Sequence, residues 1–527
     1  MKKNRSIASN AAILTVSGLA VKVIGFFFKI PLGRIITASG MGDYAPAYEM
    51  YSFALIIATA GIPVAIAKMV AERIAVGEYK NAIKVFKLSR RLMIMIGLAG
   101  FIALFFGGEI IADFINMQTA ALSIKATSFA LIIVPVVAAY RGFFQGTNDM
   151  VPTAVSEVVE QLFRTSVGLL LAILFYYEIG ISSKGASISQ LQSKGAVGAC
   201  LGASIGAVAA LIVLIGFYRN REIETGKERL DRSIEIILEL IRIALPITLT
   251  ASILSIVNLI DISIVQTRLL DLGYSYNKAK SMYGELTSFA APIIGIPMVF
   301  VQSLGISLLP AVAKDYKLNN IELAIKKTEE AFTIASSIIF PCAIGLFILA
   351  EPILKLLYGS QISADSPSVR SLRVYAICFV FIALTTLASS ILQSIGRQRA
   401  STEFMIIGII FKTILTWVLT GIEQVNVLGA PIGTTVAYII SSILDLRFLK
   451  RKIDYSLQPK RIIHILLLSL LMGAFVIIVF MLLNSVFGNG FSVLMSIAVG
   501  IIMYFALGFR FRIIPIEIIE YVINRGR

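Results

Sequence analysis

Long apolar stretches recur along this chain from one end to the other. Hydrophobic residues occupy 57% of the 527 positions and charged residues only 15%, whereas a soluble chain carries roughly a quarter charged residues. A membrane-spanning helix needs about 20 mostly apolar residues, and no segment between the stretches is long enough for a soluble domain. The sequence therefore predicts an all-α polytopic membrane protein. Its fourteen transmembrane helices are expected at approximately residues 8–36, 44–76, 89–115, 122–146, 152–178, 195–218, 234–268, 282–313, 328–350, 370–396, 401–422, 427–449, 462–484 and 490–511.

The formal charge of +16 is distributed unequally between alternate loops. If the N-terminus lies inside, the loops on that side carry most of the loop Lys and Arg residues. The opposite loops hold only Lys184, Lys194, Lys278, Lys280 and Lys355. Cytoplasmic loops of membrane proteins carry such an excess, so both termini are predicted to be cytoplasmic. The dispersal of the charge over many short loops argues against a nucleic-acid partner.

The cysteines and the single histidine do not form a recognisable site. Cys200, Cys342 and Cys378 lie far apart within apolar stretches, and His464 lies at the start of one. Neither a disulfide framework nor a metal site has this spacing. We therefore expect no metal and no cofactor.

A diverged internal repeat divides the chain. Arg34-Ile35-Ile36 corresponds to Arg268-Leu269-Leu270, and Gly61-Ile62-Pro63 corresponds to Gly295-Ile296-Pro297 at the same separation. The pattern predicts two six-helix lobes with the same orientation, related by a pseudo-twofold axis along the membrane normal. The lobes are expected at residues 1–232 and 233–458, and a C-terminal helix pair with a tail at 459–527. Transporters with parallel repeats bind substrate between their two halves.

Several charges fall within the predicted helices, where each costs about 3 kcal/mol or more near the bilayer centre. Lys22 and Lys29 share one face of the first helix, and we expect Pro31 and Gly33 to interrupt that helix just before Arg34. Cations nearer to helix ends can extend to the headgroups. We expect this of Arg73, Lys125, Arg141, Arg242, Arg370 and Arg373.

Helices 2, 7 and 8 add further charges. Helix 2 is expected to break at Gly61-Ile62-Pro63, and helix 8 contains Pro292 and Pro297. We infer that helices 1, 2, 7 and 8 line a water-filled, net-cationic cavity between the lobes. Its substrate should be anionic. The candidate substrate-binding residues are Lys22, Lys29, Arg34, Lys68 and Arg268, and the candidate cavity or gating carboxylates are Glu49, Asp261 and Glu285. Two alternatives stay open. The cations could instead pair internally with these carboxylates, and Asp261 could neutralise Arg268 or Lys412 or help to bind a coupling cation.

Several segments resemble a known family. They are Lys22-Val23-Ile24-Gly25-Phe26, the following Arg34 and Gly42-Asp43, and the cytoplasmic turn Arg141-Gly142-Phe143-Phe144-Gln145-Gly146 with Pro152-Thr153-Ala154. They resemble the polysaccharide-transport and lipid II flippase branch of the multidrug/oligosaccharidyl-lipid/polysaccharide exporter superfamily, and in particular its MurJ-type and stage V sporulation protein B-like group. The resemblance covers the whole chain, and the Arg-Gly-x-x-Gln-Gly turn is fairly specific to this group.

The resemblance implies a flippase of the bacterial cytoplasmic membrane that has no covalent catalytic step. It would carry an undecaprenyl-diphosphate-linked saccharide, first of all the peptidoglycan precursor lipid II, from the inner to the outer leaflet by alternating access. Lys22 stands where the family has a first-helix arginine. Arg34 and Asp43 match in place, which adds Asp43 to the candidate cavity or gating residues. Helix 8 of this chain has no arginine within the membrane. Arg268 would therefore have to take the role that the resemblance implies for a helix 8 cation at the diphosphate.

Other function classes would be expected to show other sequence features. A cation-coupled multidrug exporter of the same superfamily would favour a carboxylate-lined cavity, which the Lys22 and Lys29 stripe argues against. A flippase for another lipid-linked polysaccharide unit is a further alternative. A polyprenyl-phosphate glycosyltransferase or polymerase would need clustered carboxylates or a sizeable outer domain, and the sequence has neither. We expect a monomer whose partners are its lipid-linked substrate and membrane lipids, driven by the membrane potential or a monovalent cation.

Overall fold

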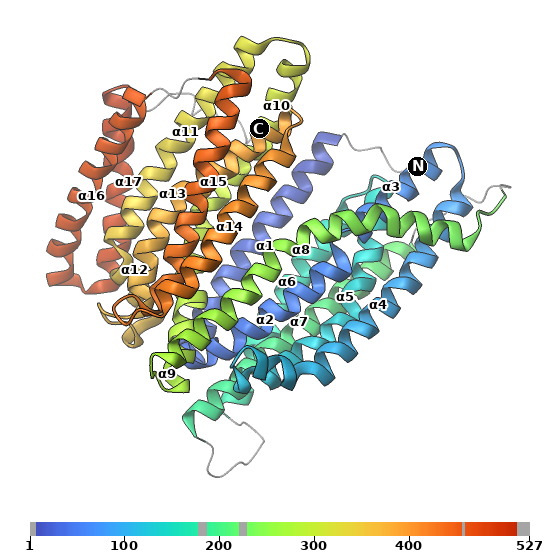
Figure 1. Ribbon diagram of the computed structural model, residues 1–527, viewed down its shortest axis with the longest axis horizontal. Helices are drawn as coiled ribbons and strands as arrows, with labels where there is room; N and C mark the ends of the chain where they lie inside the picture. Colours follow the sequence, from blue (N-terminus) through green and yellow to red (C-terminus); the bar gives the residue numbers. More distant parts are fainter. Residues whose placement is uncertain (1–6, 178–186, 221–228, 456–458, 514–527) are drawn as a thin grey trace. The chain divides into compact units, whose positions relative to one another are not determined.

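The computed structural model of the protein describes residues 7–177, 187–220, 229–455 and 459–513, which are almost entirely helical (Figure 1). The loop cation Lys184 and both terminal segments lie outside the described residues. Fourteen helical segments in the described part are long and apolar enough to cross a membrane. The predicted all-α class and the fourteen predicted spans are therefore confirmed.

Most spans are single helices, because a chain in lipid must satisfy its backbone hydrogen bonds within the span. The second span is divided into α2 and α3, and the eighth into α9 and α10. A short additional helix, α12, precedes the tenth span. The helices are α1 (Ile7–Ile35), α2 (Thr37–Thr59), α3 (Ile62–Ala75), α4 (Tyr79–Phe114), α5 (Ala121–Gly146), α6 (Val151–Tyr176), α7 (Ile188–Arg219), α8 (Ser233–Asp271), α9 (Tyr276–Gly284), α10 (Gly295–Lys317), α11 (Ile321–Ile348), α12 (Ala350–Tyr358), α13 (Pro367–Ser394), α14 (Gln398–Thr420), α15 (Gly429–Ile453), α16 (Pro459–Phe487) and α17 (Asn489–Arg510).

The two divided spans are interrupted where glycine and proline predicted it. Between α2 and α3 the chain breaks at Gly61, and Pro63 lies in the first turn of α3, where its missing N–H leaves no hydrogen bond unmade. Between α9 and α10 the backbone passes through a π-helical turn, Glu285–Ala290, and a 3₁₀ turn, Ala291–Ile294. The break predicted in the second helix is confirmed, and the eighth span is interrupted at the segment that contains Pro292.

The predicted break in the first helix is wrong. Helix α1 continues through Pro31 and Gly33 to Ile35, and the chain bends only at Ile36, before Thr37 with a positive φ of 57°. One proline removes a single backbone donor, and a membrane helix can compensate for this locally. Arg34 therefore belongs to the last turn of an unbroken α1.

The chain divides into two compact units. The first contains Met1–Leu270 and Tyr274–Gly284, and the second contains Asp271–Gly273 and Glu285–Arg527. Helix α9 and nearly all of α8 thus belong to the first unit, although the repeat assigns them to the second half of the chain. The repeat, and not compactness, defines the predicted lobes at 1–232 and 233–458 and the helix pair at 459–527. This division stays a prediction.

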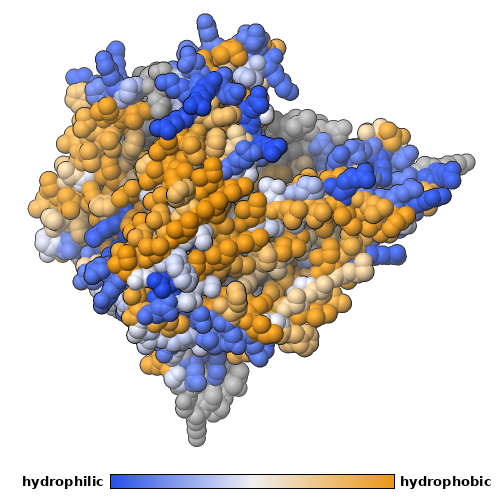
Figure 2. Space-filling view, viewed as in Figure 1, coloured by the Kyte–Doolittle hydropathy of each residue, from blue (hydrophilic) through white to orange (hydrophobic). Residues whose placement is uncertain are grey.

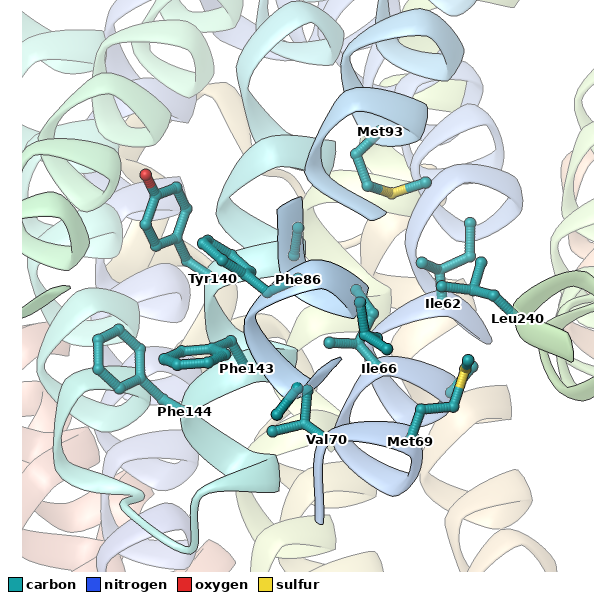
Figure 3. Packing of buried hydrophobic residues seen from close by; sticks show 14 of the residues in the cluster. Ile62, Ile66, Met69, Val70, Phe86, Met93, Tyr140, Phe143, Phe144 and Leu240 are labelled. Atoms are coloured by element: carbon teal, nitrogen blue, oxygen red, sulfur yellow. The ribbon is translucent and has the colours of Figure 1, made fainter. Parts of the chain in front are cut away.

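The core of the first unit joins α3, α4, α5 and α8 through buried apolar side chains (Figure 3). The Phe86 ring lies 4.9 Å from the Tyr140 ring and 4.8 Å from the Phe143 ring, centroid to centroid. Such aromatic pairs add about 0.5–1.5 kcal/mol beyond the area that they bury. The cluster shown in Figure 3 includes Ile62, Ile66, Met69, Val70, Phe86, Met93, Tyr140, Phe143, Phe144 and Leu240.

Two apolar clusters lie among the described residues of the second unit. The larger one includes Leu304 of α10, Phe332 of α11, Phe379 of α13 and Leu449 of α15. The smaller one joins α16 and α17, and the Tyr504 hydroxyl of α17 donates to the backbone carbonyl of Ser337 in α11 at 3.0 Å. The flanks of many helices remain apolar at the surface (Figure 2), as expected for helices that contact lipid.

Candidate functional site

Eight of the nine nominated site residues lie in the first unit, and Glu285 lies in the second. On α1, Lys22 and Arg34 are exposed and Lys29 is half-buried. Cations at such positions in a spanning helix normally face water, a ligand or a partner. Lys22 and Arg34 are therefore accessible on α1, and a role of these cations in binding a substrate stays a prediction.

One contact joins two of the nominated helices. The Asn258 side chain on α8 approaches Glu49 on α2 with Nδ2 3.4 Å from Oε2. Asp261 and Arg268, one and three turns further along α8, are half-buried. Helices α2 and α8 thus bring a carboxylate and an amide together within one unit.

Two nominated residues have other contacts. Lys68 on α3 is exposed and lies 3.8 Å from Glu72, one turn away, and an exposed pair of this kind contributes at most about 1 kcal/mol. Glu285 accepts hydrogen bonds from the Ser368 backbone N–H at 3.0 Å and hydroxyl at 2.8 Å. Because Ser368 lies in the first turn of α13, Glu285 caps that helix from the π-helical turn.

Asp43 is the centre of a buried polar cluster at the start of α2. The side chains of Asp43 and of Lys280 in α9 are both fully buried, and Lys280 Nζ lies 2.9 Å from Asp43 Oδ2. Thr119 donates to Asp43 Oδ1 and Ser193 donates to Oδ2, each at 2.5 Å. The carboxylate therefore has a counter-charge and two hydroxyl donors, which a buried ion requires.

Each hydroxyl group around the ion pair has one hydrogen to donate, and this determines which group donates and which accepts. The Thr119 hydroxyl gives its only hydrogen to Asp43, so the Tyr276 hydroxyl, 2.9 Å away, must donate to Thr119. Tyr276 accepts in turn from the Thr119 backbone N–H at 3.0 Å, and Lys280 Nζ lies 3.2 Å from the Thr119 hydroxyl. The cluster of Asp43, Thr119, Ser193, Tyr276 and Lys280 joins α2, α7, α9 and the turn before α5.

Glycines allow the close packing that brings the ion pair together. A Cβ atom on Gly42 would overlap the Lys280 carbonyl oxygen and lie 2.6 Å from its Cγ. A Cβ atom on Gly284 would overlap the Ala38 carbonyl oxygen and lie 2.7 Å from the Gly42 nitrogen. Small residues permit this close approach between membrane helices. The Gly42-Asp43 pair therefore supplies both the space and the charge.

Lys280, predicted to be a loop cation of the outer side, is a fully buried residue of α9. It lies in a polar segment, Ser275-Tyr276-Asn277-Lys278-Ala279-Lys280, which looks like a loop. The spacing of this segment could have indicated a helix. Every fourth residue, at Tyr276, Lys280 and Gly284, falls on the same helical face. Asp43 itself was nominated, but its partner was not.

A second charged cluster in the first unit contains two arginines and one carboxylate. Arg141 Nη2 donates to Glu160 Oε2 at 2.9 Å and its Nε donates to Ser156 at 3.0 Å. Arg164 donates to Glu160 Oε1 at 3.0 Å, and its guanidinium lies 5.9 Å from the centre of the Tyr51 ring. Glu160 thus accepts from both guanidinium groups and joins α5 to α6.

The segment Arg141–Gly146, predicted as a cytoplasmic turn, is the helical end of α5. Its glycines pack α5 against α3, because a Cβ atom on Gly142 would lie 2.8 Å from the Pro63 carbonyl oxygen and one on Gly146 2.7 Å from that of Ala67. The turn itself follows, with Asn148 at a positive φ of 56°. The Arg-Gly-x-x-Gln-Gly pattern thus combines a charged contact with a close helix contact.

Four of the six cations that were expected to extend to the headgroups have carboxylate partners. Arg73 contacts Asp231 at 2.9 Å and Glu239 at 3.2 Å. The other pairs are Lys125 with Glu109, Arg141 with Glu160, and Arg370 with Asp365. In the described part of the chain, no group of three or more His, Cys, Asp or Glu residues is arranged to hold a metal ion.

Comparisons of the sequence give consistent relatives. A family model described as "Polysaccharide biosynthesis protein" matches residues 7–315, and one described as "MatE" matches residues 286–418. The chain is 27% identical over 486 residues to the lipid II flippase MurJ of Bacillus subtilis (strain 168), which covers 89% of this chain and 87% of that protein. It is 24% identical over 460 residues to stage V sporulation protein B of the same organism, with 85% and 84% covered.

Solved structures share the fold. A structure described as "Lipid II flippase MurJ, inward closed conformation" aligns with a TM-score of 0.71 at 17% identity and covers 95% of this chain and 99% of that one. An inward-facing multidrug resistance MATE family transporter of the MOP superfamily aligns with a TM-score of 0.66 at 15% identity, with 84% and 98% covered. The helices are therefore arranged as in the MurJ and MATE transporters.

Proposed function

We propose a transport function for this chain, which belongs to the polysaccharide biosynthesis protein family of the multidrug/oligosaccharidyl-lipid/polysaccharide exporter superfamily. The matched members of this superfamily are transporters and not enzymes. The cargo of this chain, we infer, is an undecaprenyl-diphosphate-linked saccharide, and the peptidoglycan precursor lipid II is the preferred candidate. The protein moves this cargo from the inner to the outer leaflet by alternating access.

The observation that carries this proposal is the accessible cationic stripe on α1. Lys22 and Arg34 are exposed and Lys29 is half-buried within a span of high hydropathy. Cations are expensive in such a span unless they meet water or an anion. Accessible cations attract a diphosphate, and lysine binds it as a point charge without the bidentate geometry of arginine.

Each of the other nominated residues has its own role in this proposal. Arg268 joins the α1 cations at the diphosphate, and Lys68 attracts the substrate from the exposed face of α3. Glu49 and Asp261 lower the net positive charge of the site. Asp43 and Glu285 control the conformational change by fixing α9 and the π-helical turn to their neighbours.

The proposed orientation places both termini in the cytoplasm of a bacterium, as the loop charges predict. In an inside-negative membrane, moving one negative charge outward releases about 2.3 kcal/mol per 100 mV. The membrane potential is thus a sufficient energy source for an anionic cargo, and we propose it as the driving force.

The proposal is tested by complementation of a bacterial strain depleted of its lipid II flippase, together with an assay of lipid II on the outer leaflet. The wild-type chain should restore growth and outer-leaflet exposure. Lys22→Gln and Lys29→Gln should each lower exposure by about tenfold or more, because each removes an attraction to the diphosphate. Lys22→Arg keeps the charge and should retain activity. Lys87→Gln, which removes an exposed lysine of α4, is the matched control and should also retain it.

Full rescue by the Lys22→Gln, Lys29→Gln double variant at normal membrane abundance would refute the assignment of the stripe to the substrate. The match of the MatE model to residues 286–418 supports a second candidate, a cation-coupled multidrug exporter. That function predicts drug resistance in an overexpressing strain and no change in outer-leaflet lipid II. A third outcome, exposure of a different lipid-linked saccharide, would identify another polysaccharide unit as the cargo.

A further inference from the structure

Asp445 is a buried carboxyl group that has no part in the function proposed above. It lies on α15 in the second unit, and its side chain is fully buried. Helices α14 and α15 are neighbours there and are drawn in orange in Figure 1. Ionisable residues within membrane spans are rare, and they commonly bind protons, ions or substrates. This makes Asp445 a candidate for a site of its own.

Asp445 has a single hydrogen-bond partner in the described part of the chain. Its Oδ2 accepts from the hydroxyl of Ser401 on α14 at 3.2 Å, whereas its Oδ1 is buried without a partner. Asp43, by contrast, has the counter-charge of Lys280 and two hydroxyl donors. An ionised carboxylate at Asp445 would exchange its hydration for one hydrogen bond, and a buried group in this situation takes up a proton instead.

The charged groups of α14 do not neutralise Asp445. Arg399 and Glu403 pair with each other at 2.9 Å and are exposed. Lys412 lies 11 residues beyond Ser401, which is about 16 Å along the helix. The first turn of α14 carries a partial positive charge, but the hydroxyl of Ser401 is the donor that reaches Asp445 in the described structure.

The other elements packed against α15 bring no counter-charge to Asp445 either. The 3₁₀ turn Asn426–Leu428 has no titratable residue. Tyr438 lies two turns before Asp445, and the Tyr455 hydroxyl donates to the Leu446 carbonyl at 3.4 Å. On α13, the charged and titratable groups all lie in the first half of the helix, and they are Arg370, Arg373, Tyr375 and Cys378. On α15 itself, the cations are exposed, and they are Arg447, Lys450, Arg451 and Lys452.

The contact between α14 and α15 is close near Asp445. A Cβ atom on Gly408 would lie 2.6 Å from the Ala437 carbonyl oxygen. The Ser441 hydroxyl, one turn before Asp445, donates to the Phe404 carbonyl at 3.3 Å. Small residues allow such an approach between membrane helices. Because this packing buries Asp445, its carboxyl group meets water only when the contact loosens, and proton exchange is linked to the helix packing.

The internal repeat indicates that the fold does not require an acid at this position. Gly198-Ala199 of α7 corresponds to Gly429-Ala430 of α15 at a separation of 231 residues. Both glycines pack closely on the preceding span, Gly198 on α6 and Gly429 on α14. At the same separation, Asp445 corresponds to Leu214, which is fully buried in the core of the first unit. An apolar side chain therefore suits the equivalent position, and packing alone does not explain the carboxyl group.

We propose that Asp445 is a proton-binding site of the second unit. Its carboxyl group is protonated while α14 and α15 are packed as described, and it releases the proton to water when they separate. Binding forms one O–H bond on a carboxyl oxygen with a proton taken from water, and no other bond changes. Acidic conditions thus favour the packed arrangement of the two helices, and alkaline conditions favour its opening. The inference does not depend on the identity of the transported cargo.

The first test is infrared difference spectroscopy of the full-length protein purified in detergent. A protonated carboxyl group has a carbonyl stretching band that a carboxylate lacks. At neutral pH this band should be present in the wild-type spectrum and missing from that of Asp445→Asn, and raising the pH should remove it from the wild type. Ser401→Ala should shift the band, because it removes the hydrogen bond to Oδ2.

Asp454→Asn is the matched control, since it makes the same substitution at an exposed carboxylate just after α15. The residue there has a positive φ of 46°, which asparagine also adopts. This variant should keep the band.

The second test is the pH dependence of unfolding in SDS. Above about pH 4, where an aspartate of an unfolded chain ionises, the folded protein holds one more proton at Asp445 than the unfolded chain does. Stability therefore falls as the pH rises, and the unfolding equilibrium constant increases by up to about tenfold per pH unit until the folded site loses its proton. Asp445→Asn should lack this contribution, and Asp454→Asn should keep it. An unchanged infrared band or an unchanged pH dependence in Asp445→Asn, or equal changes in both variants, would each overturn the proposal.

Discussion

Two sets of charged residues within the spans of the first unit differ in their exposure. Lys280 is fully buried against Asp43, with threonine and serine hydroxyls completing the shell. Lys22 and Arg34 lie exposed along α1. A buried pair has lost its hydration and depends on its partner, whereas an exposed cation keeps its capacity to attract something else. The difference separates a buried pair that holds helices together from cations that are accessible at the surface of α1.

The largest expected effect breaks the buried pair. Lys280→Met should lower the free energy of unfolding by about 3–5 kcal/mol, because it leaves the Asp43 carboxylate buried without a counter-charge. The Asp43→Asn, Lys280→Met double variant should recover at least half of this loss, since the amide that replaces the carboxylate is uncharged and can still bond to the two hydroxyls. Unfolding of the purified protein in SDS measures both. A loss below about 1 kcal/mol for the single variant would contradict the distinction between the two sets of charges.

A smaller effect is expected from the packing that places the pair. Gly42→Ala should cost about 1–3 kcal/mol, because its Cβ would overlap the Lys280 backbone and push α9 away from α2. Gly216→Ala on α7 is the matched control, since no atom lies within 4 Å of its Cβ position. It should be neutral or stabilising by up to ~1 kcal/mol. Equal effects of the two substitutions in SDS unfolding would show that the close contact has no energetic role.

The smallest effect is predicted for the exposed stripe. Lys22→Gln should change the free energy of unfolding by less than about 0.5 kcal/mol, as is usual for an exposed position, although it should impair transport. The same SDS titration checks this. If its destabilisation approached that of Lys280→Met, Lys22 would be another structural charge, and the two regions would no longer differ.

The spans could be predicted because length and hydropathy are local properties of the sequence. The breaks at Gly61–Pro63 and in the eighth span followed from local residues as well. The continuation of α1 through Pro31 did not, since a proline bends, interrupts or merely weakens a helix according to its surroundings. Local chemistry therefore predicted where the helices lie better than it predicted where they end.

The candidate site was predictable only in part, because partners in space are not visible in one sequence. The nomination of Asp43 relied on a resemblance, and Lys280 looked like a loop residue until the helix that contains it was known. The partners of Arg73 and Arg141 were missed for the same reason, since Asp231 and Glu160 lie on other segments of the chain. Charged residues in spans could be nominated, but their pairing depends on the tertiary contacts.

The Asp43–Lys280 pair also has a consequence for biogenesis. The two residues are 237 positions apart, so a ribosome adding about 5–20 residues per second makes the lysine roughly 10–50 s after the aspartate. Thr119 and Ser193 are synthesised in between. The carboxylate is thus made before its counter-ion exists, and its partners become available one at a time. The first unit is not complete until the eighth span has begun to insert.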